Sequence, residues 1–299
     1  VGMEQLEQGV QVVFHSNMHK ADPRDLPPVN PVTTVVDRTR PFVKIQDGCD
    51  AHCTYCIIPA VRGPAQSASV GRVVDAVERL VNQGWVEIVL AGVHLGTYRD
   101  PDDKNLVDLV DAVLAVPGLV RMRLSCIEPM AFPFALVDRA AADPRFCPHF
   151  HLPLQSGSDR VLKRMVRPYR GQDYVDMAQR LKATLPHACL GTDVIVGFPG
   201  ETEEDFLDTQ RVIEDAGIDY LHVFSYSDRT GTPATQLGPK VGSHAAKDRS
   251  RRLIAQGAER WPRYLDRQLG KPLSAVRLEG LGVTLAASPP EARPELSVS

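Results

Sequence analysis

Three of the six cysteines in this 299-residue chain lie within eight residues of one another, as Cys49, Cys53 and Cys56. Their C-x3-C-x2-C spacing places three thiolates on one short loop. There they can hold three corners of an iron–sulfur cube and leave the fourth iron open to a substrate. The alternative is a zinc ion whose fourth ligand comes from elsewhere in the chain. The candidate fourth ligands are His52, His15 and His19. The cysteine triplet by itself leaves both alternatives open.

The composition limits the class of protein. Six cysteines are too few for a disulfide scaffold, and residues 1–4 do not begin a signal peptide, so we expect a reducing compartment, the cytoplasm. Hydrophobic residues at 43% and charged residues at 24% exclude pervasive disorder and fibrous repeats. No run approaches the roughly 18 apolar residues of a membrane span, so no membrane is expected among the partners. A net charge of −3 argues against a polycation but not against a local basic patch for RNA.

Hydrophobic periodicity divides the chain into three parts, 1–40, 41–240 and 241–299. The first part has a short apolar run and then several prolines, which predicts a linker or the remnant of another domain. In the second part, short apolar runs alternate with segments of helical period. The predicted strands are 42–45, 88–91, 122–124, 149–154, 193–196 and 221–224. The predicted helices between them are 70–81, 106–113, 134–142, 159–165, 172–185 and 202–213.

Strands that alternate with helices predict an α/β fold with a parallel sheet, whose ligands gather at the carboxyl ends of the strands. Polar and glycine-rich segments follow the predicted strands, as a large cofactor pocket requires. They are residues 46–49, 92–94, 125–128, 155–158 and 197–200. The cysteine loop follows the first strand directly, and this position favours the iron–sulfur cluster over zinc.

Several separated motifs over residues 41–240 resemble the radical S-adenosylmethionine (SAM) methylthiotransferases. The motifs are KIQDGC (44–49), CTYCIIP (53–59), RG (62–63), LSCIEP (124–129), PLQSGS (153–158) and DVIVGFPGET (193–202). The resemblance implies a partial (β/α)6 barrel of the radical SAM type. It also implies a 4Fe-4S cluster with three cysteine ligands, Cys49, Cys53 and Cys56, and a low-potential electron donor.

The same resemblance implies the chemistry. SAM chelates the open iron, an electron from the cluster cleaves the sulfonium, and the resulting 5′-deoxyadenosyl radical removes hydrogen from an unactivated carbon. Two residues are expected near adenine, and five more are expected to line the ribose and methionine. The adenine neighbours are Tyr55 and Ile195; the others are Gly92, Ser125, Glu128, Gln155 and Asp193.

Two segments, GVHLGTY (92–98) and LHVFSYS (221–227), resemble the branch that acts on N6-threonylcarbamoyladenosine beside the tRNA anticodon. We therefore expect 2-methylthiolation of this nucleoside, with the tRNA anticodon loop as partner. His94 and His222 can also simply cap or pack at strand ends, which is the commoner role of a lone histidine. The alternatives are a methylthiotransferase for a ribosomal-protein aspartate and a non-catalytic zinc-binding fragment that contacts RNA.

The chain departs from the family in its cysteines. Family members carry an N-terminal domain with three more cysteines for a second 4Fe-4S cluster, and these ligands are absent here. Cys126 follows the third predicted strand, whereas Cys147 and Cys189 precede the fourth and fifth. Since these positions fall at opposite ends of a parallel sheet, the three are predicted to be ordinary buried thiols. The chain taken alone is expected to cleave SAM without inserting sulfur, as a truncated or fragmentary protein.

The third part begins with a long helix rich in arginine and lysine, predicted to break near Pro262. Its basic residues are equally consistent with phosphate contacts and with a solvated face. Two β-like pieces follow, 275–278 and 283–286, which resemble the start of the family's RNA-binding β-module but end before it closes. Residues 288–299 are predicted to fray.

Overall fold

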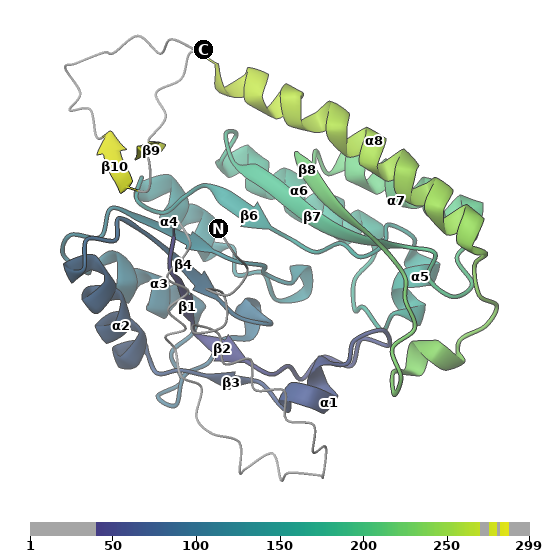
Figure 1. The fold of residues 1–299 in the computed structure, drawn as a ribbon, viewed down its shortest axis with the longest axis horizontal. Coiled ribbons are helices and arrows are strands. Elements are labelled where there is room, and N and C mark those ends of the chain that lie inside the picture. Colours follow the sequence, from purple (N-terminus) through teal and green to yellow (C-terminus); the bar gives the residue numbers. More distant parts are fainter. Residues whose placement is uncertain (1–39, 270–274, 280–281, 287–299) are drawn as a thin grey trace, which may run out of the picture.

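The computed structural model describes residues 40–269 and the backbone of two further segments, 275–279 and 282–286 (Figure 1). The predictions made for residues 1–39 and 288–299, including His15 and His19, lie outside the described residues.

Two three-stranded parallel sheets, β1-β4-β5 and β6-β7-β8, form the centre of the described part. Their strands are β1 Phe42–Lys44, β4 Glu87–Ala91, β5 Arg121–Leu124, β6 His149–His151, β7 Cys189–Val196 and β8 Tyr220–Ser225. Parallel bridges from Met122 to Phe146 and from Cys126 to His151 connect β5 to β6. These six strands therefore form one parallel series in chain order, which confirms the predicted partial barrel.

Helices cover the outside of this series, α2 to α4 over the first sheet and α5 to α7 over the second (Figure 1). They are α2 Val70–Asn82, α3 Leu106–Leu114, α4 Ala135–Ala142, α5 Asp159–Arg164, α6 Gly171–Thr184 and α7 Glu203–Asp215. In α2 the buried residues Val73, Ala76, Val77 and Leu80 form one face of the helix. The remaining short elements are α1 Ile58–Arg62, the antiparallel pair β2 Gln46–Asp47 and β3 Gln66–Ser67, and the 3-10 turns η3 Leu95–Thr97, η4 Pro129–Ala131 and η5 Pro233–Gln236.

Two strands differ in length from the prediction. The fourth was predicted to run to residue 154 but β6 ends at His151, because Pro153 lacks an N–H for the ladder and Gln155 has a positive φ of 67°. The fifth was predicted to start at residue 193, but β7 starts at Cys189. Its first half contains Gly191, which weakens a strand pattern although it pairs with Tyr220 of β8.

Thr202 and Asp205 form a capping box at the start of α7. The Thr202 backbone N–H donates to Asp205 Oδ2 at 2.7 Å, and the Asp205 N–H donates to Thr202 Oγ1 at 3.3 Å. The Ser158 hydroxyl also donates to Asp205 Oδ1 at 2.6 Å, and Arg160 forms an ion pair with the same carboxylate. Asp205 thus connects α7 to the start of α5.

Replacing Asp205 with asparagine is expected to lower the free energy of unfolding by about 1–3 kcal/mol near neutral pH, because buried donors lose their acceptor. Burial raises the pKa of Asp205, but the bonds from Arg160 and Ser158 outweigh it and hold the pKa below its usual 3.8. This stabilisation is present above about 3.8 and is lost as the pH falls further. Urea unfolding at several pH values checks this prediction. The difference in unfolding free energy between wild type and D205N is expected to narrow in acid. The half-buried Asp208, which among the described residues pairs only with Arg211 on its own helix, provides the control Asp208→Asn, and an equal loss there contradicts the prediction.

The basic helix α8, Ser243–Gln268, runs through Pro262 without a break, so the predicted break is wrong. It lies along β8 (Figure 1). Ion pairs fix it at three points: Arg249 with Glu201, Arg260 with Glu214, and Arg267 with Asp219. This packing compensates for the hydrogen bond that proline cannot make. The arginines at these three points are bound to the barrel and do not form a solvated face.

Two further observations concern the last two strands and the lengths of the described helices. The strands β9 Ala275–Glu279 and β10 Gly282–Ala286 pair antiparallel, which confirms the two β-like pieces. Among the described helices, none is both long and apolar enough to cross a membrane.

Candidate active site

The cysteine loop starts at a position that only glycine fits. Gly48 has a φ of +68°, and a Cβ built there would lie 1.9 Å from the carbonyl oxygen of Pro64. The next residue, Cys49, donates its N–H to the Gly63 carbonyl at 3.1 Å. The loop is therefore anchored against the segment that follows α1, and its sulfurs begin from a fixed backbone.

Replacing Gly48 with alanine is expected to abolish the binding of a metal group by this loop, because the backbone must move to relieve the clash. Iron per chain after anaerobic reconstitution measures the effect. Gly71→Ala is the control, since no atom lies within 4 Å of its added Cβ and alanine favours the helix. Full iron content in G48A contradicts the account of the loop.

The three thiols are spaced for a group larger than one ion. Cys53 is buried, and Cys49 and Cys56 are half-buried. Among the described residues, one group of three metal-binding side chains has its donor atoms within 4.8 Å of one another, and the three sulfurs do not form such a group. A single zinc with 2.3 Å bonds would hold its sulfurs about 3.8 Å apart. At least one pair of these sulfurs is thus farther apart than a single zinc would hold them, which favours a larger group such as an iron–sulfur cube. His52, a candidate zinc ligand, is exposed.

His94 lies beside Cys49, with Nδ1 3.9 Å from Sγ. Its ring is buried, its Nε2 has no hydrogen-bond partner, and burial lowers its pKa. Gln46 Oε1 accepts the His94 backbone N–H at 2.8 Å and positions it. His94 thus places Nδ1 beside Cys49 Sγ and leaves Nε2 without a partner among the described residues, which is more than simple packing at a strand end explains.

Arg167 is a site residue that the sequence analysis missed. It is buried, donates to Cys53 Sγ at 3.5 Å from Nη1, and forms an ion pair with Glu128. Its Nε also donates to the Tyr169 hydroxyl at 3.1 Å. The preceding Val166 has a φ of +57°, a conformation that β-branched residues avoid. The loop thus stores strain where it turns Arg167 toward the cysteines. In the sequence, the only signal is a lone arginine before Pro168.

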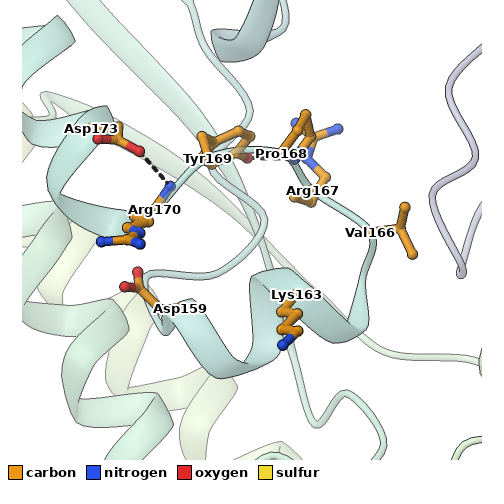
Figure 2. Close-up of a pocket in the computed structure, with 8 residues that line it drawn as sticks. All are labelled: Asp159, Lys163, Val166, Arg167, Pro168, Tyr169, Arg170 and Asp173. Carbon is orange, nitrogen blue, oxygen red and sulfur yellow. Dashed lines mark hydrogen bonds between the residues drawn. The ribbon is translucent and has the colours of Figure 1, made fainter.

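A hollow of about 570 Å³ lies on this α5–α6 loop, and Figure 2 shows the residues that line it. Its lining residues are Asp159, Lys163, Val166, Arg167, Pro168, Tyr169, Arg170 and Asp173. The Arg170 N–H donates to Asp173 Oδ2 at 2.9 Å and starts α6. Since the lining includes none of the cysteines, we do not assign this hollow to the cofactor.

The two expected adenine neighbours come together. Tyr55, from the cysteine loop, and Ile195, from β7, both pack against one small apolar cluster. The buried members of this cluster are Val161, Met165, Phe198 and Ala234. An apolar wall formed from distant segments suits the face of a purine ring.

The expected ribose and methionine residues form two linked groups. In the first, the Gly92 N–H donates to Ser125 Oγ at 3.4 Å, which joins the ends of β4 and β5. In the second, the Gln155 N–H donates to the Asp193 carbonyl at 2.8 Å, and the Ile195 N–H donates to the Gln155 carbonyl at 2.9 Å. Gln155 is buried with a positive φ of 67°, another strained residue at this rim. Glu128 joins the cysteine loop through Arg167.

A polar cluster lies on the second sheet. Asp193 Oδ1 is 2.9 Å from His151 Nε2 and 3.1 Å from His222 Nδ1. This is the group of donors within 4.8 Å of one another. Burial raises the pKa of Asp193, but the two histidines outweigh it and hold the pKa below its usual value. Sequence analysis named Asp193 and His222 separately, but not His151 or the cluster itself, because its members come from three separate strands.

The other cysteines lie where the topology predicts. Cys126 follows β5, Cys147 precedes β6, and Cys189 is the first residue of β7. Cys147 and Cys189 are buried and Cys126 is half-buried. Burial raises the pKa of each thiol. Cys126 is thus at the opposite end of the sheet from the other two.

The family model of the radical SAM superfamily matches residues 43–213, more than half of the chain. The chain belongs to the radical SAM superfamily. Membership implies a 4Fe-4S cluster and SAM as cofactors. The matched segment contains the cysteine loop and the strands β4 to β7.

Among curated proteins, this radical SAM chain is similar to threonylcarbamoyladenosine tRNA methylthiotransferase MtaB from two organisms. It is 38% identical to that of Rickettsia prowazekii, over 82% of this chain and 59% of the relative. It is 42% identical to that of Bacillus subtilis, over 75% and 50%. It is also 42% identical to a tRNA-2-methylthio-N(6)-dimethylallyladenosine synthase of Leifsonia xyli, over 72% and 40%. The chain spans about half the length of the curated relatives it matches.

Solved structures of radical SAM enzymes share the fold. The methyltransferase TsrM of Kitasatospora setae has a TM-score of 0.54 at 19% identity, over 64% of this chain and 35% of that one. Coproporphyrinogen III oxidase (HemN) of Escherichia coli has a TM-score of 0.52 at 15% identity, over 73% and 52%. At these identities the likeness shows the fold alone.

Proposed function

We propose that this chain is the radical SAM core of a tRNA methylthiotransferase, which adds a 2-methylthio group to N6-threonylcarbamoyladenosine beside the anticodon. The observation that carries the proposal is the cysteine loop at the carboxyl end of β1, whose three sulfurs are not gathered as they would be around a single ion. Relatives that share this core are named for methylthiolation of modified adenosines in tRNA.

In this proposal, Cys49, Cys53 and Cys56 hold a 4Fe-4S cluster. When bound, a reduced cluster and SAM supply reductive cleavage of the sulfonium and removal of hydrogen from an unactivated carbon. The chain's own residues bind and orient. Tyr55 and Ile195 provide the apolar wall for adenine.

The polar rim completes the SAM site in the same proposal. Gly92, Ser125, Gln155 and Asp193 provide polar atoms for ribose and methionine at the ends of β4 to β7. Glu128, held by the buried Arg167, adds a carboxylate beside the cysteine loop. Hydrogen bonds already present between these residues fix the rim before SAM arrives.

The family resemblance on which the proposal rests implies that sulfur insertion needs a second cluster. Cys126, Cys147 and Cys189 do not meet at one end of the sheet, so we propose that they hold no cluster. The described residues then suffice for SAM cleavage alone.

The test is anaerobic reconstitution with iron, sulfide and a low-potential reductant, followed by SAM and an anticodon stem-loop RNA that carries N6-threonylcarbamoyladenosine. We expect 5′-deoxyadenosine formation that this RNA stimulates, and that Cys53→Ala abolishes. Two results contradict the proposal: SAM cleavage that the RNA leaves unchanged, and a methylthio group found on a ribosomal protein by mass spectrometry.

A further inference from the structure

We propose that His222, supported by Asp193 and His151, forms a subsite for the hydrogen-bonding, polar part of the substrate's N6 substituent. This inference rests on the proposed function and specifies which modified adenosine the site accepts. The relatives match at similar identity whether they are named for a threonylcarbamoyl or a dimethylallyl substituent, so identity does not choose between them. The polar side-chain cluster on the second sheet distinguishes between these two substituents.

The cluster is built by strand register. Asp193 of β7 and His222 of β8 are directly paired across parallel strands, so their side chains share one face of the sheet. His151, the last residue of β6, reaches the same carboxylate from the other side, with its ring 5.3 Å from that of His222 and nearly parallel to it. Three neighbouring strands thus direct polar groups to one point.

A rigid layer supports the cluster from behind. The Tyr220 hydroxyl lies 3.1 Å from His151 Nδ1 and 2.9 Å from His149 Nε2. The Tyr220 ring is held against Gly191, where an added Cβ would lie 2.0 Å from it. His151 is therefore fixed through both ring nitrogens, and it holds Asp193 in place.

His222 is the member that faces outward. Its side chain is 57% exposed, against 24% for Asp193 and 9% for His151. Because Nδ1 points to Asp193, the opposite nitrogen, Nε2, points away from the carboxylate. The ring thus presents one polar atom in a fixed direction beside Asp193, a residue of the proposed SAM site.

This polar atom distinguishes the two substituents. An ionised Asp193 accepts a hydrogen bond from Nδ1–H, so Nε2 of the neutral ring can accept a hydrogen bond from a hydroxyl or N–H. A threonylcarbamoyl group carries a carboxylate, a hydroxyl and N–H groups, whereas a dimethylallyl group carries none of these. Burying an apolar substituent against His222 would leave its nitrogen unpaired.

The same side chains do not form a good cation site. The two histidine nitrogens lie 2.9 and 3.1 Å from one carboxylate oxygen, which are hydrogen-bond distances. Ligands of a tetrahedral ion with bonds near 2.0 Å lie about 3.3 Å apart. The polar atoms are thus paired with one another, and Nε2 of His222 remains for a ligand.

The test measures Kd for two anticodon stem-loop RNAs that differ only in the N6 substituent, threonylcarbamoyl or dimethylallyl. The reconstituted chain with SAM is used. We expect wild type to bind the threonylcarbamoyl RNA about 10- to 100-fold more tightly. His222→Phe keeps the aromatic ring and is expected to remove this preference, whereas His222→Gln retains part of it. His187→Phe, an exposed position before β7, is the control and keeps the preference.

Three outcomes overturn the inference. They are equal affinity of wild type for both RNAs, an unchanged preference in His222→Phe with normal iron content and circular dichroism, and a preference that a chelator of divalent cations removes. The first two leave the proposed function intact if RNA still stimulates SAM cleavage. Failure of both RNAs to bind contradicts the proposed function itself.

Discussion

Replacement of Arg167 with leucine is expected to slow SAM cleavage by about 10- to 100-fold, the usual effect of losing a residue that supports metal ligands. Arg167 donates to Cys53 Sγ and forms an ion pair with Glu128, and both partners belong to the proposed cofactor site. Burial alone lowers the pKa of Arg167, but its neighbours Tyr169 and Glu128 raise it above the usual value, so the guanidinium stays charged.

The leucine variant loses two functions of this side chain. Without the N–H donor on sulfur, the reduction potential of the cluster is expected to become more negative, since hydrogen bonds to the sulfurs help to set it. Without the cation, Glu128 is left with an uncompensated charge beside the cysteines. Arg167 acts through the ligands and is a positioning residue.

Arg167→Lys separates these two functions. Lysine keeps the positive charge that compensates Glu128, so the stability of the protein is expected to recover. It lacks the planar guanidinium that also reaches Cys53, so the reduction potential of the cluster is expected to stay more negative than in wild type. Potentiometric titration and 5′-deoxyadenosine formation are the measurements. Lys163→Leu, exposed in the preceding helix α5, is the control. A potential equal to that of wild type in R167L contradicts this account of Arg167.

Replacement of Arg249 with leucine is expected to lower the free energy of unfolding by about 3–5 kcal/mol, the usual effect of breaking a buried ion pair. Arg249 on α8 donates to Glu201 Oε2 at 2.8 Å, and both side chains are more than nine-tenths buried. The same oxygen accepts the Gly197 N–H. The pair therefore joins α8 to the turn that follows β7.

The destabilisation of R249L is expected to grow with pH. Burial already raises the pKa of Glu201, although Gly197 and Arg249 oppose it. Without Arg249, the ionised form of Glu201 lacks a counterion, whereas the protonated form needs none. The loss of unfolding free energy relative to wild type therefore increases as the pH rises above about 4.5. Urea unfolding across pH measures this effect.

Two variants complete this experiment. Arg249→Leu combined with Glu201→Gln is expected to recover part of the stability, because no buried charge remains. The exposed Arg251→Leu is expected to change it by less than about 0.5 kcal/mol. A deficit in R249L that is independent of pH and of Glu201 contradicts the role of the buried pair.

The sequence predicted the strand order well because apolar runs and helical periods are local patterns. The Thr202–Asp205 cap also follows from local spacing. Arg167 and the cluster of His151, Asp193 and His222 were missed because contacts between distant segments create them, and no spacing in the chain encodes these contacts. The break at Pro262 was wrong for the same reason, since ion pairs from other elements hold α8 together.

Iron and sulfide per chain after anaerobic reconstitution test the central claim most directly. The account predicts about four irons, lost when Cys49, Cys53 and Cys56 are replaced with alanine and retained when Cys126, Cys147 and Cys189 are replaced. Zinc without iron in the reconstituted protein contradicts the claim. A content of about eight irons would mean that the second set of cysteines holds a cluster and that the argument from opposite ends of the sheet is wrong.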